Sequence, residues 1–127
     1  MLSAGSRLSK LTFWLALLAV MAAATTPVAV PLPATANDKV QHMLAFALLA
    51  FLALRAYPVA GWLRVLAGLA LYGALIEIVQ MIPALHRMSE WRDWAADLAG
   101  VAIALIIRGL VAARRLARPL SSKSPRL

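Results

Sequence analysis

The sequence contains no cysteine and few charged residues. Without cysteine the chain can form no disulfide, no thiolate metal site and no cysteine nucleophile, and its redox compartment stays undetermined. Charged residues make up 14% of the 127 residues, whereas hydrophobic residues make up 63%, against roughly 45 to 50% in soluble domains. This composition predicts an integral membrane protein.

Acidic residues are especially scarce: five Asp and Glu stand against 13 Lys and Arg, which gives a net charge of +8. Such a balance can indicate nucleic-acid binding. Here, however, the basic residues lie in short segments beside apolar stretches, where they report membrane topology. No aromatic-rich basic face or recognition motif accompanies them, so we do not expect a nucleic-acid partner.

Four apolar stretches approach the length that a transmembrane helix needs, which is about 20 residues. Prolines separate them, because proline removes a helix donor and disfavours helix in the residue before it: Pro31 follows the first stretch, Pro58 the second and Pro83 the third. The sequence therefore predicts an all-α, four-helix transmembrane bundle with short connections. The predicted domain covers residues 1–111 with spans at 11–30, 39–56, 62–82 and 94–111, followed by a basic disordered tail at 112–127.

The distribution of Lys and Arg predicts the orientation of the bundle. Ten of these residues flank the amino end, the second connection and the carboxyl end, whereas the first and third connections hold only Lys39, Arg87 and Arg92. Because cytoplasmic segments carry the excess of basic residues, we expect both termini in the cytoplasm. The first and third connections, with all five acidic residues, would then lie outside.

The amino-terminal segment also resembles a cleavable signal peptide, with Arg7 and Lys10, an apolar run and the sequence Ala34, Thr35, Ala36. The apolar run is long for that purpose, and prolines stand where the processing site would lie. We expect the first span to be retained. In either case the chain from residue 37 onward starts outside.

Polar residues recur at helical spacing on the second and third spans. Asp38 and His42 are four positions apart and share one face near the outer start of the second span, with Lys39 beside them. Glu77 and Gln80 share a face near the outer end of the third. A carboxylate in an apolar helix costs roughly 2.5 to 3.5 kcal/mol on insertion scales, so Glu77 needs a partner or a purpose.

The fourth span repeats the pattern. Asp93, Asp97 and Gly100 follow one another at i, i+4 and i+7, so one face carries two carboxylates and then a residue that allows close helix approach. Arg87 precedes this span. Three helices are thus predicted to offer polar faces at one depth, which predicts a shared site.

The strings NDKVQHMLAF, GALIEIVQ and HRMSEWRDWAADLAG resemble, in this order, the successive motifs of the VanZ-like membrane proteins, over about residues 37 to 105. The family commonly has asparagine where this chain has Asp97. It takes its name from a protein associated with reduced sensitivity to the glycopeptide antibiotic teicoplanin, so the resemblance implies a role in the bacterial cell envelope and a place in the inner membrane. By this resemblance the motif positions are Asp38, Lys39, His42, Glu77, Gln80, Arg87, Asp93 and Gly100.

Each motif residue also has a structural explanation. Asp38 and Asp93 could cap the helices that they begin, since acidic residues complement the amino-terminal end of the helix dipole. Lys39 could snorkel to the interface, and His42 could bond to a neighbouring carboxylate in a polar core. Arg87 could equally pair with a carboxylate or bind an anion.

Three functional classes follow. We favour a non-catalytic envelope protein whose outward-facing polar pocket binds a lipid-linked or anionic cell-wall component, the bilayer being its other partner. The alternatives are a membrane-embedded acid/base enzyme, with His42 and Glu77 or Asp38 transferring protons, and a proton-coupled carrier component, which would need to oligomerise. The predicted ligand-binding residues are Asp38, Lys39, His42, Glu77, Gln80, Arg87, Asp93 and Asp97.

No cofactor is predicted. His42 with Asp38, Glu77 and Asp97 offers nitrogen and oxygen ligands that suit a metal ion, but their spacing matches no dedicated metal motif. We therefore predict no metal site.

Overall fold

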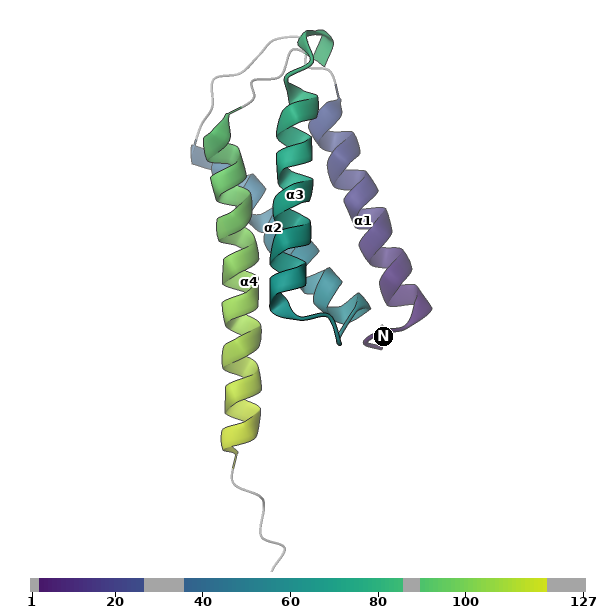
Figure 1. Ribbon diagram of the computed structural model, residues 1–127, viewed down its shortest axis with the longest axis vertical. Helices are drawn as coiled ribbons and strands as arrows, with labels where there is room; N and C mark the ends of the chain where they lie inside the picture. Colours follow the sequence, from purple (N-terminus) through teal and green to yellow (C-terminus); the bar gives the residue numbers. More distant parts are fainter. Residues whose placement is uncertain (1–2, 27–35, 86–89, 119–127) are drawn as a thin grey trace, which may run out of the picture.

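The structure, a computed structural model, describes residues 3–26, 36–85 and 90–118, and this part of the chain is entirely helical (Figure 1). The prediction of an all-α protein with four membrane-spanning helices is confirmed, because each of the four helices is long enough and apolar enough to cross a bilayer. The chain is thus a multi-pass membrane protein. Its helices are α1 (Arg7–Thr25), α2 (Ala36–Ala56), α3 (Trp62–Gln80), the short 3-10 helix η1 (Pro83–Leu85) and α4 (Trp91–Ala117).

Helix α1 begins and ends earlier than the span predicted at 11–30. Ser6 caps it, since its side chain accepts a hydrogen bond from the Ser9 backbone N–H at 3.0 Å. The helix ends at Thr25, and the last residues of the predicted span lie outside the described residues. The start was predicted too late because Arg7 and Lys10 lie before the apolar run, whereas the Ser6 cap determines where the helix begins.

Helix α4 corrects the predicted tail. It continues to Ala117, so residues 112–117 are helical, while residues 119–127 lie outside the described part. Alanine, leucine and arginine are good helix formers, and arginines in the last turn complement the helix dipole. At 1.5 Å per residue the 27 residues of α4 span about 40 Å, and its carboxyl end projects beyond the other three helices (Figure 1).

Helices α2 and α4 pack closely against each other in the centre of the bundle. A Cβ atom added to Gly100 on α4 would lie 2.2 Å from the backbone oxygen of Met43 on α2, so only glycine allows this approach. The predicted role of Gly100 in helix packing is therefore confirmed. Around this contact Phe46, Leu49 and Val101 are almost fully buried.

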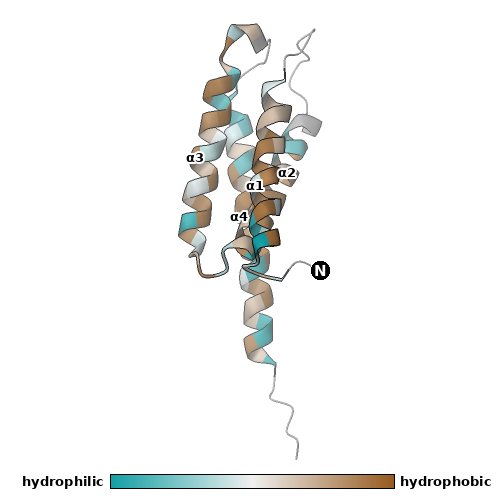
Figure 2. Cartoon of the chain, turned by 90° about the vertical axis from the view of Figure 1, so that its right-hand side faces the viewer, coloured by the Kyte–Doolittle hydropathy of each residue, from teal (hydrophilic) through white to brown (hydrophobic). Residues whose placement is uncertain are grey.

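Side-chain hydrogen bonds to backbone carbonyls join the other helices. The Tyr72 hydroxyl and the Gln80 Nε2 of α3 donate to Leu17 O and Ala24 O of α1, the second at 3.0 Å. Trp94 Nε1 of α4 donates to Ala70 O of α3 at 3.0 Å. The outer faces of α1 and α3 are mostly hydrophobic (Figure 2), as expected for helices that contact lipid.

Candidate polar ligand-binding site

Polar residues of three helices meet at the end of the bundle where α3 ends and α2 and α4 begin (Figure 1). Successive helices alternate in direction, so α2 and α4 run parallel and both begin here, and their residues come into contact although they lie 51 to 55 positions apart in the sequence. We call this group the polar cluster. It comprises Lys39 and His42 of α2, Glu77 and Gln80 of α3, and Glu90, Asp93 and Asp97 at and after the start of α4.

Lys39 joins the start of α2 to the start of α4. Its Nζ lies 2.6 Å from Asp93 Oδ1 and 2.9 Å from Glu90 Oε2. The Asp93 side chain is 6% exposed and the Lys39 side chain 24%, so solvent reaches this ion pair from the lysine side. Two carboxylates therefore compensate the charge of Lys39, and Asp93 serves as its partner.

His42 and Asp97 form the most buried pair of the cluster. His42 Nδ1 lies 2.7 Å from Asp97 Oδ1, and the Asp97 side chain is 1% exposed. An ionised carboxylate can only accept, so Nδ1 carries the proton of this hydrogen bond. The bond fixes the tautomer and the ring orientation, and it leaves His42 Nε2 3.9 Å from Asp93 Oδ2.

Helix α3 packs closely against this pair at a glycine. Gly73 faces it, and a Cβ atom at that position would lie 3.0 Å from Asp97 Oδ2 and 3.4 Å from the Phe46 ring. Any larger residue would press on the buried carboxylate. The absence of a side chain at Gly73 therefore helps α3 to cover Asp97, a role that the sequence analysis did not identify.

Glu77 connects α3 to the amino-terminal end of α4. Its Oε2 accepts a hydrogen bond from the backbone N–H of Glu90 at 3.1 Å. Glu90 is the N-cap of α4, and its own side chain makes no capping hydrogen bond. The Glu77 carboxylate thus lies at the positive end of the α4 dipole, which stabilises a negative charge there.

Gln80 lines a pocket beside the polar cluster. The residue is 6% exposed, its Nε2 donates to Ala24 O, and its buried Oε1 has no hydrogen-bond partner among the described residues. The pocket holds about 200 Å³ and is walled by α1, α2 and α3. Gln41 and His42 supply its other polar side chains, and the rest of its wall is apolar.

The charges of the cluster indicate which ligands suit it. Among the described residues four carboxylates lie with Lys39, with His42 and with Arg92, whose Nε is 3.8 Å from Glu90 Oε1. Lys39 already binds two of those carboxylates. The arrangement favours a neutral, hydrogen-bonding ligand at Gln80 and His42 over an anion at Lys39.

The structure brings most of the predicted site residues together. Six of the eight predicted ligand-binding residues, including both catalytic candidates, belong to the cluster. Of Asp38 only the helical backbone is described, and Arg87 lies outside the described residues, so both remain predictions. Within the described ranges no three His, Asp or Glu side chains are placed to hold a metal ion.

Glu90 is the functional residue that sequence reasoning missed. It stands before the span predicted at 94–111, in the third connection, whereas the structure shows that it binds Lys39 and contributes its N–H to Glu77. Its spacing of three residues from Asp93 was the available signal, because both then reach the same cation.

Comparison with known proteins adds no relative. The chain matches no protein-family profile, and it shows no significant similarity to any curated protein or solved structure. The resemblance to VanZ-like proteins therefore rests on the motifs and their order alone.

Proposed function

We propose that the chain is a VanZ-like protein of the bacterial inner membrane that binds the polar part of a lipid-linked cell-envelope component. The observation that carries this proposal is the buried Gln80 Oε1, an acceptor without a partner among the described residues, in a residue that lines the same pocket as His42. A buried amide oxygen without a hydrogen bond costs free energy, and a ligand hydroxyl or amide that donates to it recovers that cost.

The wall of the pocket supports an amphipathic ligand. Gln41, His42 and Gln80 offer hydrogen bonds, whereas Val20, Phe46 and other apolar residues surround them. A lipid carrying a hydroxyl- or amide-bearing head group meets both requirements, and it can enter sideways from the bilayer. The polar cluster ties α2 and α3, two of the three helices that wall the pocket, to α4.

The positive-inside distribution supports an outward-facing pocket with both termini in the cytoplasm. Lipid-linked precursors of the cell wall are exposed at that surface. A protein that retains such a precursor would alter the tolerance of the cell to glycopeptides such as teicoplanin, as the resemblance implies.

Gln80→Leu tests the proposal, because it removes the amide and preserves most of the side-chain volume. The purified protein is loaded with envelope lipids in nanodiscs, and retained lipids are measured by native mass spectrometry. We expect Gln80→Leu to retain about tenfold less of the lipid-linked species, the effect of leaving a buried polar partner unpaired.

Tyr72→Phe is the matched control. It also removes one hydrogen bond from α3 to the backbone of α1, but Tyr72 does not line this pocket. It should retain the lipid as the unmodified protein does. Equal retention by Gln80→Leu and the unmodified protein would refute the pocket, and equal loss in both variants would reduce Gln80 to a structural contact.

A second candidate is an acid/base enzyme acting on such a lipid, and the bond from His42 to Asp97 at 2.7 Å favours it. A histidine oriented by a carboxylate through Nδ1 presents Nε2 as a general base. Overproduction would then create a new lipid-linked product, detected by mass spectrometry of membranes and absent with His42→Ala. Membranes without any new product would exclude this candidate.

A further inference from the structure

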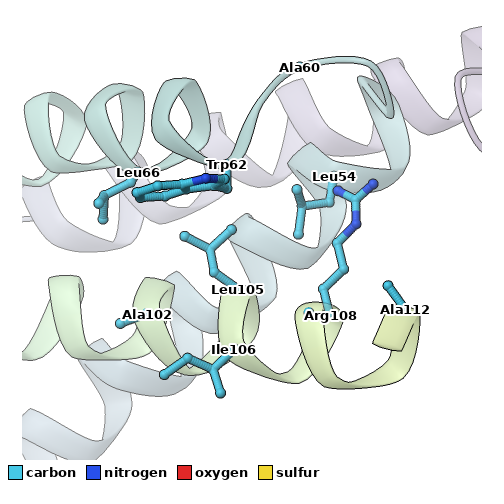
Figure 3. Close-up of a pocket in the computed structure, with 10 residues that line it drawn as sticks. Leu54, Ala60, Trp62, Leu66, Ala102, Leu105, Ile106, Arg108 and Ala112 are labelled. Atoms are coloured by element: carbon cyan, nitrogen blue, oxygen red, sulfur yellow. The ribbon is translucent and has the colours of Figure 1, made fainter. Parts of the chain in front are cut away.

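A second, larger groove lies at the opposite end of the bundle, between the end of α2, the start of α3 and the middle of α4. It holds about 580 Å³, and its wall is almost entirely apolar. Figure 3 shows Leu54, Trp62, Leu66 and Leu105 around it, and the side chain of Arg108 reaching from α4 toward the end of α2. Among the described residues, Arg108 is the only charged one that lines this groove.

The described charged residues at this end of the bundle are all basic. Arg55 and Arg64 flank the connection between α2 and α3, whereas every acidic residue of the described part lies toward the other end of the bundle. Arg108 makes no ion pair or hydrogen bond with the described residues. Its guanidinium therefore needs an anion or water from outside the described residues.

The groove opens on a face that lies within the bilayer. Ile106 and Trp62, which line it, are 60% and 63% exposed, and tryptophan at a helix start is typical of the membrane interface. An occupant of this groove must be apolar along most of its length and negative where it meets Arg108. A phospholipid combines these properties, and arginine forms paired hydrogen bonds with phosphate.

We propose that this groove binds one anionic phospholipid, with an acyl chain between α3 and α4 and its phosphate on Arg108. Arg55 and Arg64 stand at the same end of the bundle, and anionic lipids are attracted to basic segments beside transmembrane helices. The site is separate from the polar cluster and does not depend on the function proposed for it.

Two variants test separately the binding of the phosphate and the binding of the acyl chain. Arg108→Gln removes the phosphate contact and keeps the groove. Gly109→Leu fills the groove, and it should not disturb the fold, because a Cβ atom at Gly109 meets nothing within 4 Å. Arg114→Gln is the control: it removes the same charge from the same helix, six residues on and about 120° around its axis.

The measurement is the ratio of phosphatidylglycerol to phosphatidylcholine that stays bound to each purified variant in native mass spectrometry, after exchange in equimolar mixed nanodiscs. We expect a preference for phosphatidylglycerol that falls about fivefold in Arg108→Gln and is unchanged in Arg114→Gln. In Gly109→Leu both lipids should be lost. Inorganic phosphate in excess should not displace the lipid, because it cannot fill the groove.

Three results would overturn the proposal. If the unmodified protein retained both lipids equally, it would bind only the ordinary lipid shell and no specific anionic lipid. An equal fall in Arg108→Gln and Arg114→Gln would indicate a diffuse effect of net charge. Unaltered lipid retention by Gly109→Leu, with the helical content of the variant intact, would show that the acyl chain does not occupy the groove.

Discussion

The charged side chains in the two halves of α4 differ in burial and in pairing. The first half carries Asp93 and Asp97, which are 4% and 1% exposed and bind Lys39 and His42 of α2. The second half carries Arg108, Arg114 and Arg115, which are exposed and make no ion pair among the described residues. Burial explains the difference: a charge inside the bundle needs a partner from the protein, whereas a charge at the membrane surface finds water and lipid head groups.

The comparison separates two uses of charge in one helix. The acidic half fixes the relative position of α2 and α4 and builds the polar cluster. The basic half contributes little to packing and is suited to fixing the orientation of the protein and its contacts with lipid. Substitutions in the first half should therefore change stability, while equivalent substitutions in the second half should not.

The largest effect is expected for Asp97→Ala. This change leaves His42 without its buried partner, and breaking one side of a buried pair typically costs about 3 to 5 kcal/mol of unfolding free energy. Arg114→Ala in the second half should change the unfolding free energy by less than about 0.5 kcal/mol. Unfolding in mixed micelles, followed by circular dichroism during titration with sodium dodecyl sulfate, measures both.

Asp97→Asn sharpens this test. Asparagine keeps an oxygen that accepts from His42 Nδ1 at the same place, and it is the residue common in the VanZ-like family. It should recover most of the stability lost in Asp97→Ala. If the two variants were equally unstable, charge at Asp97, and not the hydrogen bond, would hold the cluster together.

The sequence predicted the fold where proline and glycine mark the chain. The end of α2 at residue 56 and the start of α3 at residue 62 agree with prediction, because Pro58 and Gly61 lie between them. The start of α1 and the end of α4 differ from prediction, because basic residues limit an apolar run without ending a helix. Hydropathy locates the membrane, and caps locate the helix ends.

The candidate site was predictable in part for a similar reason. Helical spacing placed His42, Asp97 and Glu77 at one depth, but it could not choose between Glu77 and Asp97 as the partner of His42. That choice depends on the close approach of α2 to α4 at Gly100. Glu90 was missed because it was counted with the connection and not with the helix face of Asp93 and Asp97, although its spacing of three residues from Asp93 connects it to that face.

The next largest effect is expected for Gly100→Ala. The added Cβ atom would overlap Met43 O at 2.2 Å and force α4 away from α2, which costs about 1 to 3 kcal/mol of unfolding free energy or more. Gly109→Ala, in the second half, meets open space and should be neutral or stabilising, since alanine favours helix. The same titration compares them. Equal stability of the two variants would mean that α2 and α4 are not in contact at Gly100.

The smallest measurable effect is expected for Lys39→Met, compared with Arg114→Met. Each removes one positive charge and keeps a flexible apolar chain, but only the first takes from Glu90 and Asp93 the cation that they share. Lys39→Met should lower the thermal unfolding midpoint by less than Asp97→Ala does, because Lys39 is partly exposed and water weakens its ion pairs. Arg114→Met should leave the midpoint unchanged.

Lys39→Arg should keep the midpoint of the unmodified protein, since a guanidinium can still bind both carboxylates. A midpoint that is the same in all three variants would show that the ion pairs of Lys39 add no stability, and that the two halves of α4 differ only in burial.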